Sequence, residues 1–200
     1  RALAWVLFAF LVVVLGHGEP LGVDLALYEL MHSLRNPLAD RPLAAIAAIG
    51  DADVLAPAWL AVLGYLAWRK RWLAVGHWVA AIVFGVALTG WLGVVVDIPK
   101  PPVVAGGFGF PSKAVTMSTI IFGFFAVLIS RELPGRDRAW PYVVAGVVVS
   151  TIGFARIYLG AHWLSDVVGG TLLGVVWVLI LGVAYRSRVR RSLWVKPLAW

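Results

Sequence analysis

Long apolar segments are the feature that most restricts what this chain can fold into. Hydrophobic residues make up 62% of its 200 residues and charged residues only 14%, whereas a soluble domain is about half apolar and a quarter charged. A helical membrane crossing needs about 20 apolar residues, and the two-residue alternation typical of a membrane barrel is missing. We therefore predict an all-α integral membrane bundle of about six transmembrane helices, at residues 2–16, 54–68, 72–96, 114–130, 142–161 and 163–185.

The region between the first two apolar segments has a different character. Residues 17–53 mix Pro20, Pro37, Pro42 and several charges with Ala- and Leu-rich pieces, which predicts one or two short interfacial helices in the first outer loop. The chain lacks cysteine, so thiol chemistry is excluded. We treat residues 1–200 as a single transmembrane domain, and the start at Arg1 fits a piece of a longer chain.

The basic residues predict the orientation of the bundle. With the N-terminus inside, most of the 17 Lys and Arg residues fall in inner segments, at positions 69–71, 131–138 and 186–196. Such a bias follows the positive-inside rule, so the net charge of +7 reflects membrane topology and does not indicate nucleic-acid binding. The polar residues discussed next then lie together at the outer face.

Three polar residues with the spacing R-x5-H-x3-D interrupt the apolar sequence. They are Arg156, His162 and Asp166. On a helix, His162 and Asp166 would share one face, so that the carboxylate could hold one ring nitrogen and leave the other free to attack. Arg156 offers a planar guanidinium for a phosphate group. Ionisable groups in a membrane segment are costly and usually functional, although a structural cluster joining two spans is the alternative.

A second group of candidates surrounds the start of the fourth segment. Ser112 follows Phe110-Pro111 and is a suitable N-cap, and the amides of a helix N-terminus bind anions. Two lysines, Lys100 and Lys113, are candidates for phosphate contact. The alternative for Lys113 is a lysine that extends to the membrane interface, and for Lys100 a loop lysine on a stiff turn.

These residues together resemble the type 2 phosphatidic acid phosphatase (PAP2/haloperoxidase) superfamily. Its signature has three parts, K-x6-R-P, P-S-G-H and S-R-x5-H-x3-D, and residues 155–166 match the third with Ala155 in place of Ser. The run RIYLGAHWLSDVVGG is similar to bacterial members and to the phosphatase domain of bacterial DedA–PAP2 fusions. The resemblance implies a bacterial inner membrane protein whose active site faces outward, with His162 as nucleophile, Asp166 as its partner and no metal or other cofactor.

The other two parts of the signature are incomplete. The Gly-His pair of the second part is Lys113-Ala114 here, so the histidine that protonates the leaving group in the family is missing. In the first part, Lys100-Pro101 aligns with Arg-Pro and Gly93 with the family lysine. Two of the usual phosphate cations are therefore lost or weakened.

We consequently keep two functional hypotheses. The first is a metal-independent phosphatase that forms a phosphohistidine and acts on a membrane lipid phosphate, with phosphatidic acid, phosphatidylglycerol phosphate and polyprenyl pyrophosphates as the candidates implied by the resemblance. The second is a catalytically impaired module that binds or transports a lipid phosphate, in the bilayer or beside other domains of a longer chain. A haloperoxidase shares the motif, but the known enzymes are soluble.

The topology can be tested directly because the chain has no cysteine of its own. Single cysteines at residues 69–71, 131–138 and 186–191 should be labelled only from the cytoplasm, and cysteines at residues 103–109 only from outside. A membrane-impermeant maleimide applied to cells and to inverted vesicles measures this. Labelling of a cysteine at Gly107 only from the cytoplasm would contradict the orientation.

Overall fold

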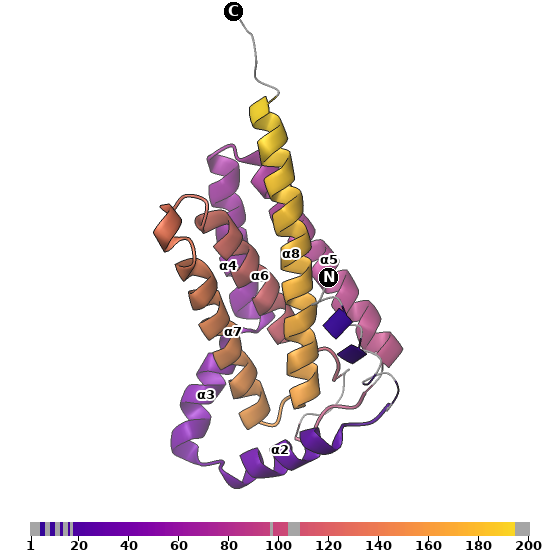
Figure 1. The fold of residues 1–200 in the computed structure, drawn as a ribbon. Coiled ribbons are helices and arrows are strands. Elements are labelled where there is room, and N and C mark those ends of the chain that lie inside the picture. Colours follow the sequence, from indigo (N-terminus) through magenta and orange to yellow (C-terminus); the bar gives the residue numbers. More distant parts are fainter. Residues whose placement is uncertain are drawn as a thin grey trace, which may run out of the picture.

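Helices form the regular structure of this protein in the computed structural model (Figure 1). The described residues are 5–6, 9–10, 13, 16, 18–96, 98–103 and 109–194. Within them the elements follow the order α2 (Gly22–Ser33), α3 (Pro37–Ile49), α4 (Ala52–Trp68), α5 (Trp72–Val96), α6 (Lys113–Ile129), the 3-10 turn η1 (Gly135–Asp137), α7 (Trp140–Tyr158) and α8 (Leu164–Trp194). The predicted all-α class is confirmed.

The helix α6 stands at the centre of the bundle and contacts α4, α5, α7 and α8. Phe124 and Ile120 of α6 are fully buried and pack in one cluster with Trp78 of α5. Large apolar side chains also lie on the surface of the bundle, where Trp91 of α5 and Val147 of α7 are exposed. Apolar side chains that point both inward and outward are expected of a bundle whose surroundings are lipid.

Several helices are long enough to cross a membrane. Among the described residues, Trp72–Val96, Gly135–Tyr158 and Leu164–Val189 have sufficient length and hydropathy, and α6 is a shorter apolar helix. The pair α3 and α4 also passes as one span with a bend of 41°. These helices include the last five predicted spans. The predicted span at residues 2–16 falls largely outside the described residues, so the total of six stays a prediction.

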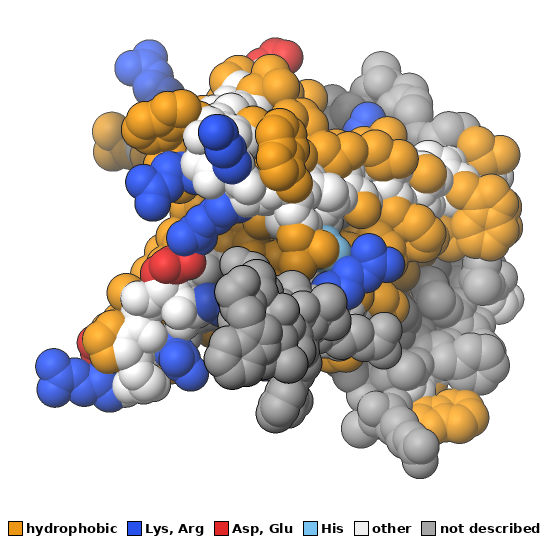
Figure 2. Space-filling model, turned by 90° about the horizontal axis from the view of Figure 1, so that it is seen from above, with side chains coloured by type: hydrophobic (Ala, Val, Ile, Leu, Met, Phe, Trp, Pro, Cys, Tyr) orange, Lys and Arg blue, Asp and Glu red, His pale blue; other side chains and the backbone are white. Residues whose placement is uncertain are grey.

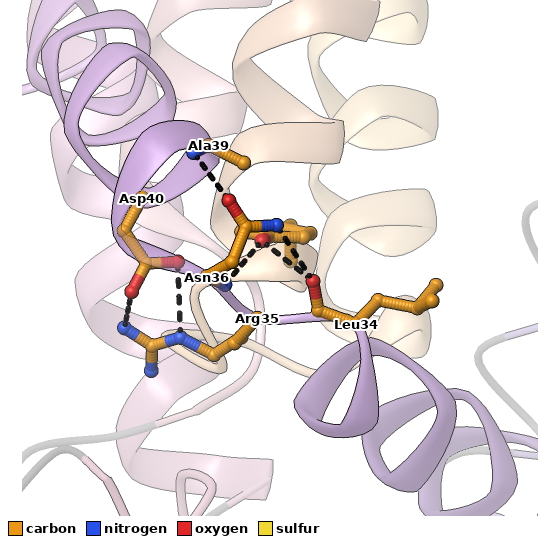
Figure 3. Close-up of polar contacts among 6 residues, drawn as sticks. Leu34, Arg35, Asn36, Ala39 and Asp40 are labelled. Atoms are coloured by element: carbon orange, nitrogen blue, oxygen red, sulfur yellow. Dashed lines mark hydrogen bonds and ion pairs between the residues drawn. The ribbon is translucent and has the colours of Figure 1, made fainter.

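Residues 18–53 contain the predicted short helices. In Figure 1, α2 runs across one end of the bundle, and α3 leads from it into α4. Asn36 caps α3 by accepting a hydrogen bond from the Ala39 amide at 2.9 Å, and Arg35 pairs with Asp40 at 3.0 Å (Figure 3). The Tyr158 hydroxyl donates to the Leu34 carbonyl at 3.1 Å. The α2–α3 connection is therefore attached to the last turn of α7.

The opposite end of the bundle is rich in basic side chains, as Figure 2 shows from above. Here the loop before α5 meets the loop after α6, because Arg71 forms an ion pair with Glu132 at 2.6 Å. The Arg71 guanidinium, by donating this hydrogen bond, lowers the pKa of the Glu132 carboxyl. Both side chains are exposed, so the pair contributes little stability, about 0–1 kcal/mol. It does place two of the predicted inner segments side by side.

Candidate active site

The turn between α7 and α8 places the candidate nucleophile. Gly160 adopts a left-handed backbone with φ 67°, and the amides of Gly160 and Ala161 donate to the carbonyls of Ile157 and Arg156 at 3.0 and 2.9 Å. These two hydrogen bonds are typical of a helix that ends at a glycine, and α7 accordingly ends at Tyr158. His162 therefore lies in the turn between the two helices, as the predicted spans at residues 142–161 and 163–185 left it, and it shares no helix face with Asp166.

The carboxylate of Asp166 nevertheless reaches His162. Asp166 lies in the first turn of α8 and is fully buried, and its Oδ2 atom is 3.3 Å from Nδ1 of His162. The same oxygen accepts the backbone N–H of Trp163 at 2.9 Å, as an acidic residue in the first turn of a helix often does. An N–H at Nδ1 then donates to the carboxylate, and Nε2 of His162 is left free with its lone pair. The hydrogen bond predicted between the two side chains is present.

The start of α6 is fixed beside the start of α8. The Ser112 amide donates to the Asp166 carbonyl at 3.1 Å. Gly170 permits this approach, because a Cβ there would stand 2.7 Å from Oγ1 of Thr116 and 3.0 Å from the Ser112 carbonyl oxygen. Ser112 occupies the N-cap position of α6 as expected, but its side chain makes no capping bond. Its buried hydroxyl has no hydrogen-bond partner among the described residues, and such groups usually bind something.

Arg156 comes from the last turn of α7 and points toward α3 and α4. Its Nη2 atom donates to the Ala47 carbonyl at 2.9 Å and forms an ion pair with Asp51. Its buried Nε atom has no partner among the described residues. Asp51 is the N-cap residue of α4. No spacing rule connects positions 51 and 156, so sequence reasoning had no signal for this contact.

Arg156 and His162 line one cavity of about 430 Å³, whereas the buried Ser112 and Asp166 are not among its lining residues. Its polar lining includes Asp51, Lys113, Arg156 and His162. Its remaining wall is mostly apolar, with Leu55, Ala56, Trp59, Ile82, Val86, Met117 and Ile121 among the lining residues. A cavity with charged groups on one part and an apolar wall on the rest suits a molecule that has a charged head and a hydrocarbon body.

Two further positions of the sequence signature, Ala114 and Lys100, lie in or near the site. Ala114 lines the cavity next to Lys113. Lys100 is partly buried in the segment after α5 and is not among the residues that line the cavity. The segment is held close to the site, because Nε1 of Trp163 donates to the Pro99 carbonyl at 2.8 Å.

A buried acid that the sequence did not single out supports the start of α8. Asp24 of α2 is 1% exposed. Its two oxygens accept the amide and the hydroxyl of Ser165, at 2.9 and 2.8 Å. Ser165 directly precedes Asp166, so Asp24 attaches α2 to the first turn of α8, which carries Asp166. An acid three residues into a helix is a common local feature, and only the fold identifies its distant partner.

The comparisons with known proteins agree with this arrangement. Residues 95–190 match the family model described as PAP2 superfamily. Phosphatidylglycerophosphatase B of Bacillus subtilis (strain 168) is 25% identical over 177 residues, which cover 84% of this chain and 85% of the relative. The resemblance to this superfamily that the third motif predicted is thereby confirmed.

Two solved structures have a similar fold. The crystal structure of a transmembrane PAP2 type phosphatidylglycerolphosphate phosphatase from Bacillus subtilis has a TM-score of 0.77 at 22% identity, over 92% of this chain and 95% of that one. The crystal structure of Aquifex aeolicus LpxE has a TM-score of 0.60 at 25% identity, over 80% of this chain and 95% of that one. The predicted integral membrane helical bundle is confirmed.

The Asp51–Arg156 ion pair gives the first prediction of the site's behaviour. Replacing Asp51 by Asn keeps a hydrogen-bond acceptor at Arg156 but removes the negative charge that opposes a bound phosphate. We expect Asp51→Asn to bind inorganic phosphate about fivefold more tightly, which corresponds to about 1 kcal/mol for a partly exposed pair. Isothermal titration calorimetry measures this affinity.

Asp53→Asn is the matched control, because Asp53 is an exposed acid in the same first turn and does not line the cavity. Its phosphate affinity should equal that of the wild type. Weaker phosphate binding by Asp51→Asn than by Asp53→Asn would mean that Asp51 chiefly positions Arg156.

Proposed function

We propose that this chain, of which residues 95–190 match the family model described as PAP2 superfamily, is a metal-independent lipid phosphate phosphatase. The observation that supports this most directly is the hydrogen bond from His162 to the buried carboxylate of Asp166, at the edge of a cavity that also contains Arg156. A histidine held through Nδ1 has Nε2 available as a nucleophile.

The reaction has two steps. In the first, the Nε2 lone pair of His162 attacks the phosphorus atom, a P–N bond forms, and the P–O bond to the lipid breaks with its electron pair leaving on oxygen, which takes its proton from water because Ala114 cannot supply one. Asp166 stabilises the positive charge that develops on the imidazole ring. In the second step, a water oxygen attacks the phosphorus and the P–N bond breaks, so that inorganic phosphate leaves and His162 is regenerated.

The surrounding groups neutralise the phosphoryl oxygens. Arg156 supplies a guanidinium, and Lys113 and Ala114, the first two residues of α6, line the same cavity. Preorganised donors and cations of this kind provide most of the rate enhancement in phosphoryl transfer. Ser112 is proposed to donate its unpartnered hydroxyl to the phosphate, and Lys100 to act as an outer cation only if the segment after α5 moves inward.

The apolar wall of the cavity supports a lipid substrate. The relatives are named for phosphatidylglycerophosphate, so a glycerophospholipid phosphate is the first substrate to try. Phosphatidic acid and polyprenyl pyrophosphates share the same combination of phosphate and hydrocarbon. The basic end of the bundle lies opposite the site, and by the positive-inside rule this supports a site at the extracytoplasmic face of a bacterial inner membrane.

An impaired binding module is the second candidate, and Ala114 is the observation that favours it. Ala114 lines the cavity beside Lys113, where the signature of the superfamily has histidine. An alanine cannot protonate the leaving oxygen. The ion pair between Arg156 and Asp51 further reduces the positive charge available to a substrate.

Phosphate release from a panel of lipid phosphates tests the main proposal. The wild type should release phosphate, and His162→Ala should release none above the rate of vesicles alone. Trapping of a base-stable, acid-labile phosphoryl group on the wild type but not on His162→Ala would identify the intermediate. His32→Ala is the control, because His32 is an exposed histidine outside the cavity. Equal release by wild type and His162→Ala would contradict the mechanism.

The missing acid generates a further prediction. Turnover should be slow for alkyl phosphates and faster for pyrophosphates and aryl phosphates, whose leaving groups need less protonation. A positioned acid typically contributes a factor of about 10²–10⁴, so Ala114→His should raise the alkyl phosphate rate toward that factor. Initial rates on matched alkyl and aryl substrates measure the effect.

The double variant Lys113→Gly with Ala114→His restores the second part of the signature, P-S-G-H, and separates the roles of the two positions. A lower rate in the double variant than in Ala114→His alone would show that Lys113 contributes to phosphate binding. Equal alkyl and aryl rates in the wild type would mean that another group supplies the proton. No release by any variant, with lipid phosphate binding retained, would favour the binding module.

A further inference from the structure

A second concave surface lies on the side of the bundle, between α6, α7 and α8. It has a volume of about 370 Å³ and shares no lining residue with the cavity of His162. We call it the lateral groove, and its lining includes Gly123, Val127, Gly146, Val178, Gly182 and Val183. An added Cβ at Gly146 would meet nothing within 4 Å. A larger side chain at this position would therefore extend into the groove.

The lateral groove ends at a group of basic and hydroxyl side chains. Arg186 and Tyr142 line the groove, and Nη2 of Arg186 lies 3.5 Å from the Tyr142 hydroxyl. Arg186 also lines an adjoining hollow of about 450 Å³ with Ser130, Arg131 and Arg138. We call Arg131, Arg138 and Arg186 the arginine cluster. It lies at the basic end of the bundle, which Figure 2 views.

The acidic side chains nearest in sequence to the arginine cluster are engaged with other cations. Glu132 pairs with Arg71 at 2.6 Å, and Asp137 lies 3.7 Å from Arg136. No acidic residue is among the described residues that line the groove or the hollow. Arg131 lies over the Tyr185 ring at 5.2 Å, and Nε of Arg138 donates to the Leu133 carbonyl at 3.2 Å. Neither contact neutralises a guanidinium, and no ion pair of the cluster is present among the described residues, so its positive charge can attract an anion from outside the chain.

We infer that the lateral groove and the arginine cluster together bind one anionic glycerophospholipid. An acyl chain fits the apolar groove between the helices, and the headgroup phosphate fits the arginines at its end. Basic pockets between transmembrane helices attract anionic headgroups, with about 1 kcal/mol for each Lys or Arg near the surface. The inference goes beyond the proposed phosphatase function and does not depend on it, because no cavity residue takes part.

Native mass spectrometry of the purified chain measures this binding. The protein is stripped of lipid in detergent and titrated with phosphatidylglycerol, with phosphatidylcholine as the zwitterionic comparison. We expect the wild type to retain phosphatidylglycerol preferentially. Each change in the series Arg131→Gln, Arg138→Gln and Arg186→Gln should weaken binding about fivefold, as expected for 1 kcal/mol. Arg136→Gln is the matched control, because Arg136 is exposed on the same loop and does not line the hollow.

A second variant tests the groove without changing charge. Gly146→Leu places a side chain in the groove and should abolish retention of phosphatidylglycerol. Gly76→Leu is its control, since a Cβ at Gly76 also meets nothing within 4 Å and Gly76 lies outside the groove. The triple arginine variant combines Arg131→Gln, Arg138→Gln and Arg186→Gln. The inference is overturned by equal retention of the two lipids, or by wild-type retention in both Gly146→Leu and the triple arginine variant.

The catalytic cavity must also be separated from the groove as the site of retention. His162→Ala and Arg156→Gln should bind phosphatidylglycerol as the wild type does. If retention disappears in Arg156→Gln and persists in the triple arginine variant, the lipid occupies the cavity and the inference is wrong. If the wild type released no phosphate, these expectations for phosphatidylglycerol binding would stay the same. Failure of the phosphatase proposal can therefore be distinguished from failure of the lipid-binding inference.

Discussion

Close contact between the first turns of α6 and α8 is the constraint on which the candidate site depends. Gly170 and Gly174 of α8 lack the Cβ atoms that would stand within 3 Å of Thr116 and Thr119. In a membrane, helices associate through such packing, because burial of apolar surface from water does not drive them together. The Ser112 amide can therefore reach the Asp166 carbonyl, and the start of α6 stands beside the buried carboxylate. A site assembled from separate spans depends on this contact.

The buried carboxylates show how the fold places charge in an apolar environment. Asp166 and Asp24 each lie in the first turn of a helix, where backbone N–H groups are free to donate. Asp24 accepts from Leu21 and Ser165, and Asp166 accepts from Trp163 and His162. These donors offset part of the cost of burying each charge, although Oδ1 of Asp166 has no hydrogen-bond partner among the described residues. The same bonds fix the backbone of the turn that holds His162, so stability and positioning come from one set of contacts.

Much of the fold could be predicted from the sequence, because its strongest signals are local. The predicted span at residues 72–96 coincides with α5, where the basic triplet before it and the Pro-rich segment after it limit the apolar run. The bend between α3 and α4 was not predicted, since the interfacial and apolar segments were treated as separate elements.

The site was predictable only where its residues are neighbours in sequence. The motif predicted the contact between His162 and Asp166, which forms although Gly160 ends α7 before His162 and the two residues share no helix face. The partners of Arg156 and Asp24 are 105 and 141 residues away, beyond the reach of any periodicity argument. Whether Lys100 and Ser112 contact phosphate depends on atoms that a sequence pattern does not position.

The ion pair between Arg156 and Asp51 has a consequence for the interval between turnovers in the proposed cycle. A guanidinium beside an apolar wall is costly when no anion accompanies it. With Asp51 in place, the empty cavity carries its own counter-ion, and an arriving phosphate exchanges one anion for another. The product is released by the reverse exchange. Arg156 is thus charge-compensated in every state of the cycle, and inorganic phosphate leaves without exposing an unpaired cation to the lipid.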